Sequence, residues 1–134
     1  MTFVDTSFWV ALQLARDERH AAAREIWREV GAPLFTTNHV VGETWTFLRR
    51  RAGHAAGLRF VEAVSGSPRL AIEHVSEALE SEAWSWLRRH DERVYSFVDA
   101  TSFAVMRRRR IREALAFDGD FRAAGFVELR PAGR

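Results

Sequence analysis

Apolar and polar residues alternate along this chain on two scales. Short apolar runs that stop abruptly at polar residues predict buried strands at 2–4, 34–37, 70–74, 115–117 and 126–129. Longer stretches repeat apolar residues every three to four positions, as Ala23, Ile26, Trp27 and Val30 do, and this spacing indicates amphipathic helices. The helices are predicted at 7–15, 20–30, 39–50, 54–65 and 77–89, with a sixth that opens at Asp99 and a short helical turn that ends at Gly125.

Helical segments separate most of the predicted strands. Alternation of this kind is typical of an α/β fold with a mostly parallel sheet of about four to five strands and helices on both faces. No repeat and no linker divides the sequence, so residues 1–134 are expected to form one domain. Asn38 and Ser76 precede two of the helices and are predicted to be their N-caps.

Composition narrows the possible classes of protein. The chain has no cysteine, which excludes disulfides and thiolate metal sites. It has no apolar run of about 18 residues and no signal-peptide layout at its start, so we expect no membrane span and a cytoplasmic location. All 20 basic residues are arginine, and the net charge is only +2. Guanidinium groups bind phosphates well, so the composition permits a nucleic-acid partner without requiring one.

Four acids occupy similar places relative to the predicted strands. Asp5 and Asp118 each follow a short strand, Asp99 opens a helix, and Glu43 lies in the second turn of the helix after the second strand. If the sheet is parallel, all four converge on its carboxyl edge, where such folds bind ligands.

Converging carboxylates repel one another unless a cation lies between them, and Mg²⁺ or Mn²⁺ prefers such oxygen ligands. Such an ion neutralises phosphate charge and acidifies bound water. Ser7 and Thr6 are neighbours that can orient a phosphate or a water. The alternative is that Asp5, Asp99 and Asp118 are plain helix N-caps. The coincidence of four acids at one edge favours the metal site.

Four motifs around these acids resemble PIN domains, and specifically the VapC-type toxin ribonucleases. They read Val4-Asp5-Thr6-Ser7, then Thr37-Asn38-His39-Val40-Val41-Gly42-Glu43-Thr44, then Tyr95-Ser96-Phe97-Val98-Asp99-Ala100-Thr101-Ser102-Phe103-Ala104, and finally Ala116-Phe117-Asp118-Gly119-Asp120-Phe121. Each motif is loose by itself. Their order and spacing together are specific, and the resemblance covers almost the whole chain.

The resemblance implies a PIN-like three-layer α/β/α domain and a metal-dependent endoribonuclease. Asp5 and Asp99 are then direct Mg²⁺ or Mn²⁺ ligands, and Glu43 and Asp118 act through water or a second ion. The implied activity is attack of water on an RNA phosphodiester. The implied partners are a VapB-like antitoxin that covers the acidic cleft and a second copy in a homodimer.

The motif around Asp99 looks most like the subgroup that cuts the sarcin–ricin loop of large-subunit rRNA. The alternative substrate is a tRNA anticodon stem-loop. Two functions from other classes remain as hypotheses, a non-catalytic RNA- or protein-binding module and a DNA flap nuclease. Retention of all four acids argues against the first, and the short chain argues against the second.

Two departures from the family pattern affect the site. Ala116 stands where relatives often have Thr or Ser, which makes Asp120 an alternative to Asp118 as the fourth acid, although the spacing to Phe121 favours Asp118. The helix after Asp99 ends in a basic run, Arg107-Arg108-Arg109-Arg110. This run is either an RNA-phosphate contact or a solvated helix end that complements the helix dipole. For Arg49–Arg51 the structural interpretation is preferred.

Overall fold

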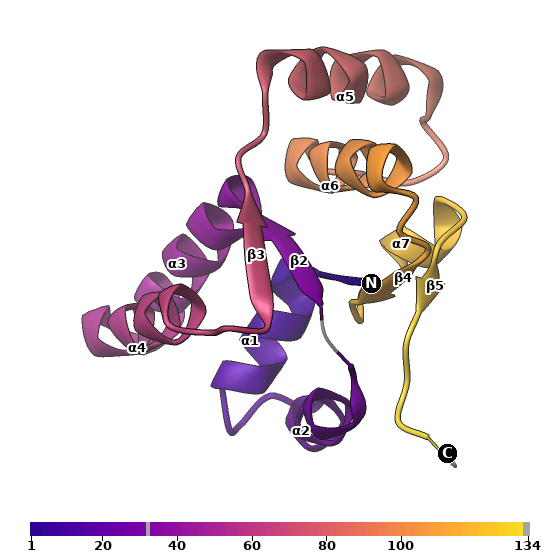
Figure 1. Cartoon of the computed structure of the whole chain (residues 1–134). Coiled ribbons are helices and arrows are strands. Elements are labelled where there is room, and N and C mark those ends of the chain that lie inside the picture. The colour runs from indigo at the N-terminus through magenta and orange to yellow at the C-terminus, as the bar shows by residue number, and fades with distance from the viewer. Residues whose placement is uncertain (32, 133–134) are drawn as a thin grey trace.

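The computed structural model describes residues 1–31 and 33–132, and its centre is a five-stranded sheet in which every pairing is parallel (Figure 1). The strands are β1 (Thr2–Val4), β2 (Leu34–Thr37), β3 (Leu70–Glu73), β4 (Glu113–Leu115) and β5 (Val127–Glu128), in the order β3-β2-β1-β4-β5. The predicted α/β class and parallel sheet are therefore confirmed. Because β1 is the middle strand, the residue that follows it lies at the centre of the carboxyl edge.

The helices pack in groups around this sheet. They are α1 (Thr6–Gln13), α2 (His20–Glu29), α3 (Asn38–Ala52), α4 (His54–Ser65), α5 (Glu77–Arg89), α6 (Phe97–Arg109) and the short α7 (Asp120–Ala123). α3 packs on α4 and on α1, and α5 packs on α6. Figure 1 shows the α3–α4 and α5–α6 pairs at separate places around the strands. No helix among the described residues is both long and apolar enough to cross a membrane.

The core is continuous across the central strands. Phe3 of β1 is fully buried, and its ring lies 6.1 Å from that of Phe121 in α7. Phe121 in turn contacts Phe103 of α6, with ring centroids 4.9 Å apart. Trp86, only 7% exposed, also packs on Phe103. These contacts fix α6 and α7, which carry Asp99 and Asp120, against the strand that precedes Asp5.

Of the two predicted N-caps, one was wrong. Thr37, not Asn38, is the N-cap of α3, because its hydroxyl accepts the N–H of Val40 at 3.1 Å. The Asn38 side chain instead accepts the N–H of Val75 at 2.8 Å. Ser76 is the cap of α5 as predicted.

The last two strands are also placed differently from the prediction. β4 ends at Leu115, before the predicted 115–117 run is complete, and β5 covers only Val127–Glu128 of the predicted 126–129. The apolar pattern continues through Phe117. The backbone N–H of Phe117, however, makes no strand pairing and donates to the Ser7 hydroxyl at 3.0 Å.

Candidate metal centre

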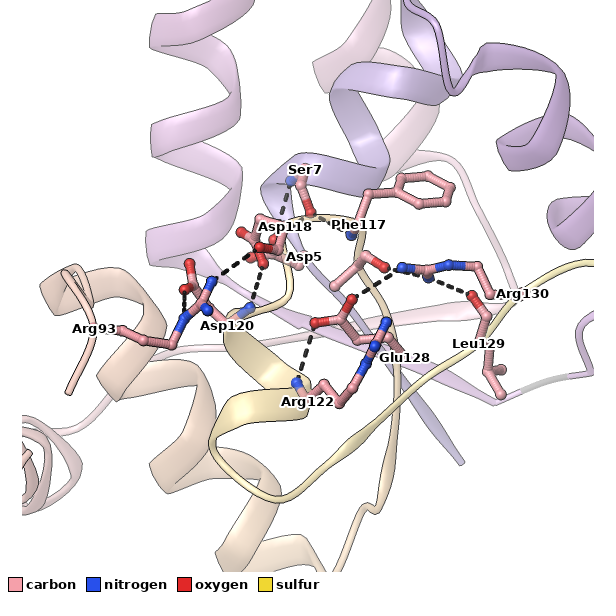
Figure 2. Close-up of polar contacts among 11 residues, drawn as sticks. Asp5, Ser7, Arg93, Phe117, Asp118, Asp120, Arg122, Glu128, Leu129 and Arg130 are labelled. Carbon is pink, nitrogen blue, oxygen red and sulfur yellow. Dashed lines mark hydrogen bonds and ion pairs between the residues drawn. The ribbon is translucent and has the colours of Figure 1, made fainter.

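Asp5 is both a helix cap and the buried floor of the site. It follows β1, is 1% exposed, and its Oδ2 accepts the backbone N–H of Ser7 at 3.1 Å and the Ser7 hydroxyl at 2.7 Å. Figure 2 shows Ser7 between Asp5 and Phe117. Thr6 contacts α3 instead, with its hydroxyl 3.5 Å from the carbonyl of Val40. Ser7 therefore orients Asp5, while Thr6 joins two helices.

Asp99 lies in the first turn of α6, which begins at Phe97, two residues before the predicted start. Its Oδ2 accepts the N–H of Ser96 at 3.1 Å, and the Ser96 hydroxyl accepts the N–H of Asp99 at 2.9 Å. This capping box fixes the side chain at 8% exposure. Among the described residues nothing donates to the other oxygen, Oδ1. One carboxylate oxygen therefore stays available to a ligand.

Asp118 lies on the turn between β4 and α7, and Asp120 is the first residue of α7. Gly119 between them has a φ of +84°, a conformation that side chains other than glycine rarely adopt. The N–H of Asp120 donates to Oδ1 of Asp118 at 3.1 Å. From the loop before α6, Arg93 donates to Oδ1 of Asp120 at 2.8 Å and to the carbonyl of Asp118 at 3.2 Å (Figure 2).

The structure brings three of these acids into one group. Asp99, Asp118 and Asp120 each place a carboxylate oxygen within 4.8 Å of the other two. Asp5 is outside this group but close enough for its charge to interact with Asp118 and Asp99. Glu43 is not in the group either. It is exposed on α3 and lines a groove whose other wall includes Val98.

The pKa values of Asp5, Asp99 and Asp118 rise because their carboxylates are desolvated and close to other acids. Burial raises the pKa of Asp5 well above its ordinary value, and the charge of Asp118 adds to the shift. Burial, with Asp118 and Asp120 nearby, raises the pKa of Asp99 to about 7. Asp118 is exposed as a residue, yet desolvation of its carboxyl group and the charges of Asp120 and Glu128 raise its pKa as well. Within the described chain, Arg93 is the basic side chain that bonds this group.

Such a donor set fits a hard divalent cation. The ligands are all carboxylate oxygens, which Mg²⁺ and Mn²⁺ prefer, and their repulsion is relieved when a cation lies among them. Raised carboxylate pKa values in a cleft also mark functional sites more often than structural ones. The alternative that Asp5, Asp99 and Asp118 are plain helix N-caps does not describe the structure, because of these three only Asp5 is an N-cap. Ser96 and Gly119 are the N-caps of α6 and α7.

Sequence reasoning missed a buried charged network behind Asp118. Glu128 of β5 has a fully buried carboxylate that accepts from the Arg122 N–H and from Arg130, both at 3.1 Å. Arg130 also donates to the carbonyl of Ala116 at 2.8 Å. A glutamate inside an apolar strand run was a signal that could have identified this network. No sequence signal marked Arg93, because it lies in a polar loop.

The basic run at the end of α6 is partly neutralised. Arg109 forms an ion pair with Glu73, and Arg107 lies 3.8 Å from Glu82. Arg108 and Arg110 are exposed. At about 1.5 Å of rise per residue, Arg107 is roughly 12 Å along the helix axis from Asp99. The contact of this run with RNA stays a prediction.

A model of the PIN domain family matches residues 2–127. The chain belongs to the PIN-domain family. It is 58% identical over 131 residues to the 23S rRNA-specific endonuclease VapC20 of Mycobacterium tuberculosis, with 98% of this PIN domain and 99% of VapC20 covered.

Solved structures agree with this assignment. The crystal structure of M. tuberculosis VapC20, a sarcin–ricin loop cleaving toxin, matches with a TM-score of 0.94 and 56% identity over 98% of this PIN domain and 100% of that chain. FitAcB from Neisseria gonorrhoeae matches with a TM-score of 0.70, 16% identity and full coverage of both chains. The second match shows the fold alone.

Proposed function

We propose that residues 1–134 form one PIN-like domain that is a metal-dependent endoribonuclease, the toxin of a type II toxin–antitoxin pair. The substrate that we infer is the sarcin–ricin loop of 23S rRNA. The observation that carries the proposal is a group of three carboxylates within 4.8 Å in a chain 58% identical to a 23S rRNA-specific endonuclease.

Asp5, Asp99 and Asp118 are the residues that we propose hold Mg²⁺ or Mn²⁺. When bound, such an ion supplies positive charge to the phosphodiester and lowers the pKa of water. Asp99 offers Oδ1, because its Oδ2 is used by Ser96. Asp118, although exposed as a residue, offers a partly desolvated carboxylate. The Ser7 hydroxyl donates to the Asp5 carboxylate and so orients it.

Two further acids have indirect roles in this proposal. Asp120 is partly neutralised by Arg93, which makes it a weaker ligand than Asp118. Glu43 lies outside the group and faces the groove beside Val98, so its proposed action is through water or on the RNA. Arg93 also holds the Asp118 backbone, so it fixes the turn that presents both acids.

The proposed protein partners are a VapB-like antitoxin over the acidic cleft and a second copy of the chain. The support for the homodimer is an exposed apolar surface on α5 and α6. Trp84 is 50% exposed, and its ring stacks on Phe97 with centroids 4.3 Å apart. Exposed aromatic surface of this kind is typical of protein interfaces.

Cleavage of purified ribosomes and of bulk tRNA by the antitoxin-free protein tests the function. Each RNA is incubated with Mg²⁺, with Mn²⁺ and with chelator. Asp99→Asn is the inactive variant, and Asp91→Asn, at an exposed position in the loop before α6, is the matched control. We expect one discrete 23S rRNA fragment that disappears with chelator and with Asp99→Asn but persists with Asp91→Asn.

Other outcomes change the proposal in defined ways. Discrete tRNA halves with intact rRNA would mean that the substrate is tRNA, while the metal-dependent mechanism stands. No metal-dependent cutting of either RNA by folded protein favours a non-catalytic binding module.

A further inference from the structure

A groove of about 940 Å³ runs along α3 beside the acidic group. Residues that recur every three to four positions on one face of α3 line it, among them His39, Glu43, Phe47 and Arg50. Phe47 also lines a second, smaller hollow of about 380 Å³ that contains Ser7 and Asp118. Phe47 therefore borders both the α3 groove and the hollow that contains Asp118, one of the candidate metal ligands.

The far end of this groove is basic and its charge is not compensated. Arg50 and Arg51 line the groove and are exposed. Within the described residues neither makes an ion pair, in contrast to Arg107 and Arg109 at the end of α6. A helix dipole explains why arginines are tolerated at the end of α3, but it does not explain why two of them face a groove.

An exposed aromatic ring lies between the acids and these arginines. Phe47 is 36% exposed, and the Arg51 guanidinium lies 4.8 Å from the centre of its ring. A ring for stacking beside unpaired guanidinium groups matches the alternating bases and phosphates of a nucleic-acid strand. An apolar protein segment would offer no negative group to pair with these two arginines.

We propose that the RNA strand next to the cleaved phosphodiester lies along α3, with a base stacked on Phe47 and phosphates against Arg50 and Arg51. This inference rests on the proposed ribonuclease function and names where its substrate binds. It assigns an RNA-phosphate contact to the end of α3, where the sequence pattern favoured a structural role, whereas that pattern left an RNA contact open for the basic run at the end of α6.

The phosphate contacts are tested by the salt dependence of binding. The Kd of a labelled stem-loop RNA with the sarcin–ricin loop sequence is measured in the Asp99→Asn background, where the RNA is not cut. We expect Arg50→Gln combined with Arg51→Gln to weaken binding on the order of tenfold at 0.15 M salt, and to reduce the slope of log K against log salt by about 1.4 to 1.8. Arg24→Gln combined with Arg28→Gln, two exposed arginines on α2, removes the same charge and should leave the slope near that of the parent.

The stacking contact is tested by two substitutions of Phe47. Phe47→Leu keeps an apolar side chain but removes the ring, and should weaken RNA binding on the order of tenfold. Phe47→Tyr keeps the ring and should bind as the parent does. When Arg50→Gln and Arg51→Gln are introduced together into the enzyme that keeps Asp99, KM should rise and kcat should stay within about twofold. The reason is that these two arginines bind RNA away from the reacting atoms.

The outcomes separate this inference from the proposed function. If the unchanged protein cuts no RNA, the ribonuclease proposal fails. If it cuts RNA while the arginine pair and Phe47→Leu keep the parental Kd and slope, the groove inference fails. If those variants keep RNA binding but are no longer inhibited by the co-purified antitoxin, the groove binds protein and the inference is overturned. If thermal unfolding shows that the double variant of Arg50 and Arg51 is not folded, the comparison of RNA binding by Phe47→Leu and Phe47→Tyr decides.

Discussion

The Ser7 hydroxyl donates to Oδ2 of Asp5 at 2.7 Å and accepts the backbone N–H of Phe117 at 3.0 Å. One side chain at the start of α1 thereby joins the buried acid after β1 to the segment that leads from β4 to Asp118. The two acids come from opposite ends of the sequence, and this contact joins their segments in addition to the pairing of β1 with β4. Residues that orient ligands from behind typically change metal affinity or activity by about 10–100-fold when they are removed.

Ser7→Ala is expected to weaken both folding and cleavage. The buried Asp5 carboxylate loses a donor and the Phe117 N–H loses its acceptor, so the free energy of unfolding should fall by about 1–3 kcal/mol. Metal-dependent cleavage should fall by about 10–100-fold. Urea unfolding and ribosome cleavage measure the two effects. Ser7→Thr, which keeps the hydroxyl, and Ser65→Ala, at an exposed position of α4, are the controls. Parental cleavage by Ser7→Ala would show that Asp5 needs no orientation.

The stability of the metal-free protein should decrease as pH rises from about 4 to about 7. Burial raises the pKa of folded Asp99 to about 7, whereas an unfolded aspartate titrates near 3.9. Between these values the folded state holds a proton that the unfolded state has released, so raising the pH favours unfolding. The loss attributable to Asp99 is up to about 4 kcal/mol. Asp5 and Asp118, whose pKa values are also raised, change stability in the same direction.

Urea unfolding with chelator at several pH values measures this loss. Asp99→Asn should flatten the curve, because it removes the titrating group but keeps an oxygen for the capping box. Saturating Mg²⁺ should stabilise the protein increasingly as pH rises, since the ion binds the carboxylate form. A parent curve with chelator that runs parallel to that of Asp99→Asn contradicts the prediction.

Local pattern predicted the position of Asp5 well. A short apolar run, then an acid, then a helical stripe defines a strand tip wherever it occurs, and β1 and α1 follow it closely. Asp99 was placed correctly at a helix start, although Ser96, and not Asp99, is the cap. In each case the neighbours that decide the structure lie within a few residues along the chain.

Contacts between distant segments account for what the pattern did not predict. β4 ends early because the Phe117 N–H bonds to Ser7, 110 positions away. Asp120 rather than Glu43 completes the group of three acids, because the turn at Gly119 and the bond from Arg93 place it there. Hydrophobic periodicity carries no information about such contacts.

Asp118→Asn is expected to reduce cleavage and Mg²⁺ affinity more than Asp120→Asn does. Asp120 is already neutralised in part by Arg93 at 2.8 Å, whereas the Asp118 side chain accepts only the N–H of Asp120 within the described chain. We expect at least about a tenfold larger loss for Asp118→Asn, in the range of other groups that support a metal site. Mg²⁺ titration of thermal stability, together with ribosome cleavage, measures it. Equal losses would mean that both acids are ligands.

Arg130→Met is expected to destabilise the protein through Glu128. The Glu128 carboxylate is fully buried and accepts from Arg130 and from the Arg122 N–H. Without Arg130 the negative charge of Glu128 has no guanidinium partner. Removal of one partner from a buried ion pair typically costs about 3–5 kcal/mol. Because Arg130 is about one-third exposed, we expect a smaller loss of about 2 kcal/mol in urea unfolding.

A double-mutant cycle with Glu128→Gln distinguishes charge from packing. If the uncompensated charge causes the loss, Glu128→Gln combined with Arg130→Met should be more stable than Arg130→Met alone. Additive losses would instead assign the effect to the contacts of Arg130 with the Phe117 ring and the Ala116 carbonyl.

The same substitution of Arg130 should also affect the metal site. The charge of Glu128 raises the pKa of Asp118, so leaving that charge unpaired should make Asp118 harder to ionise and lower the affinity for Mg²⁺.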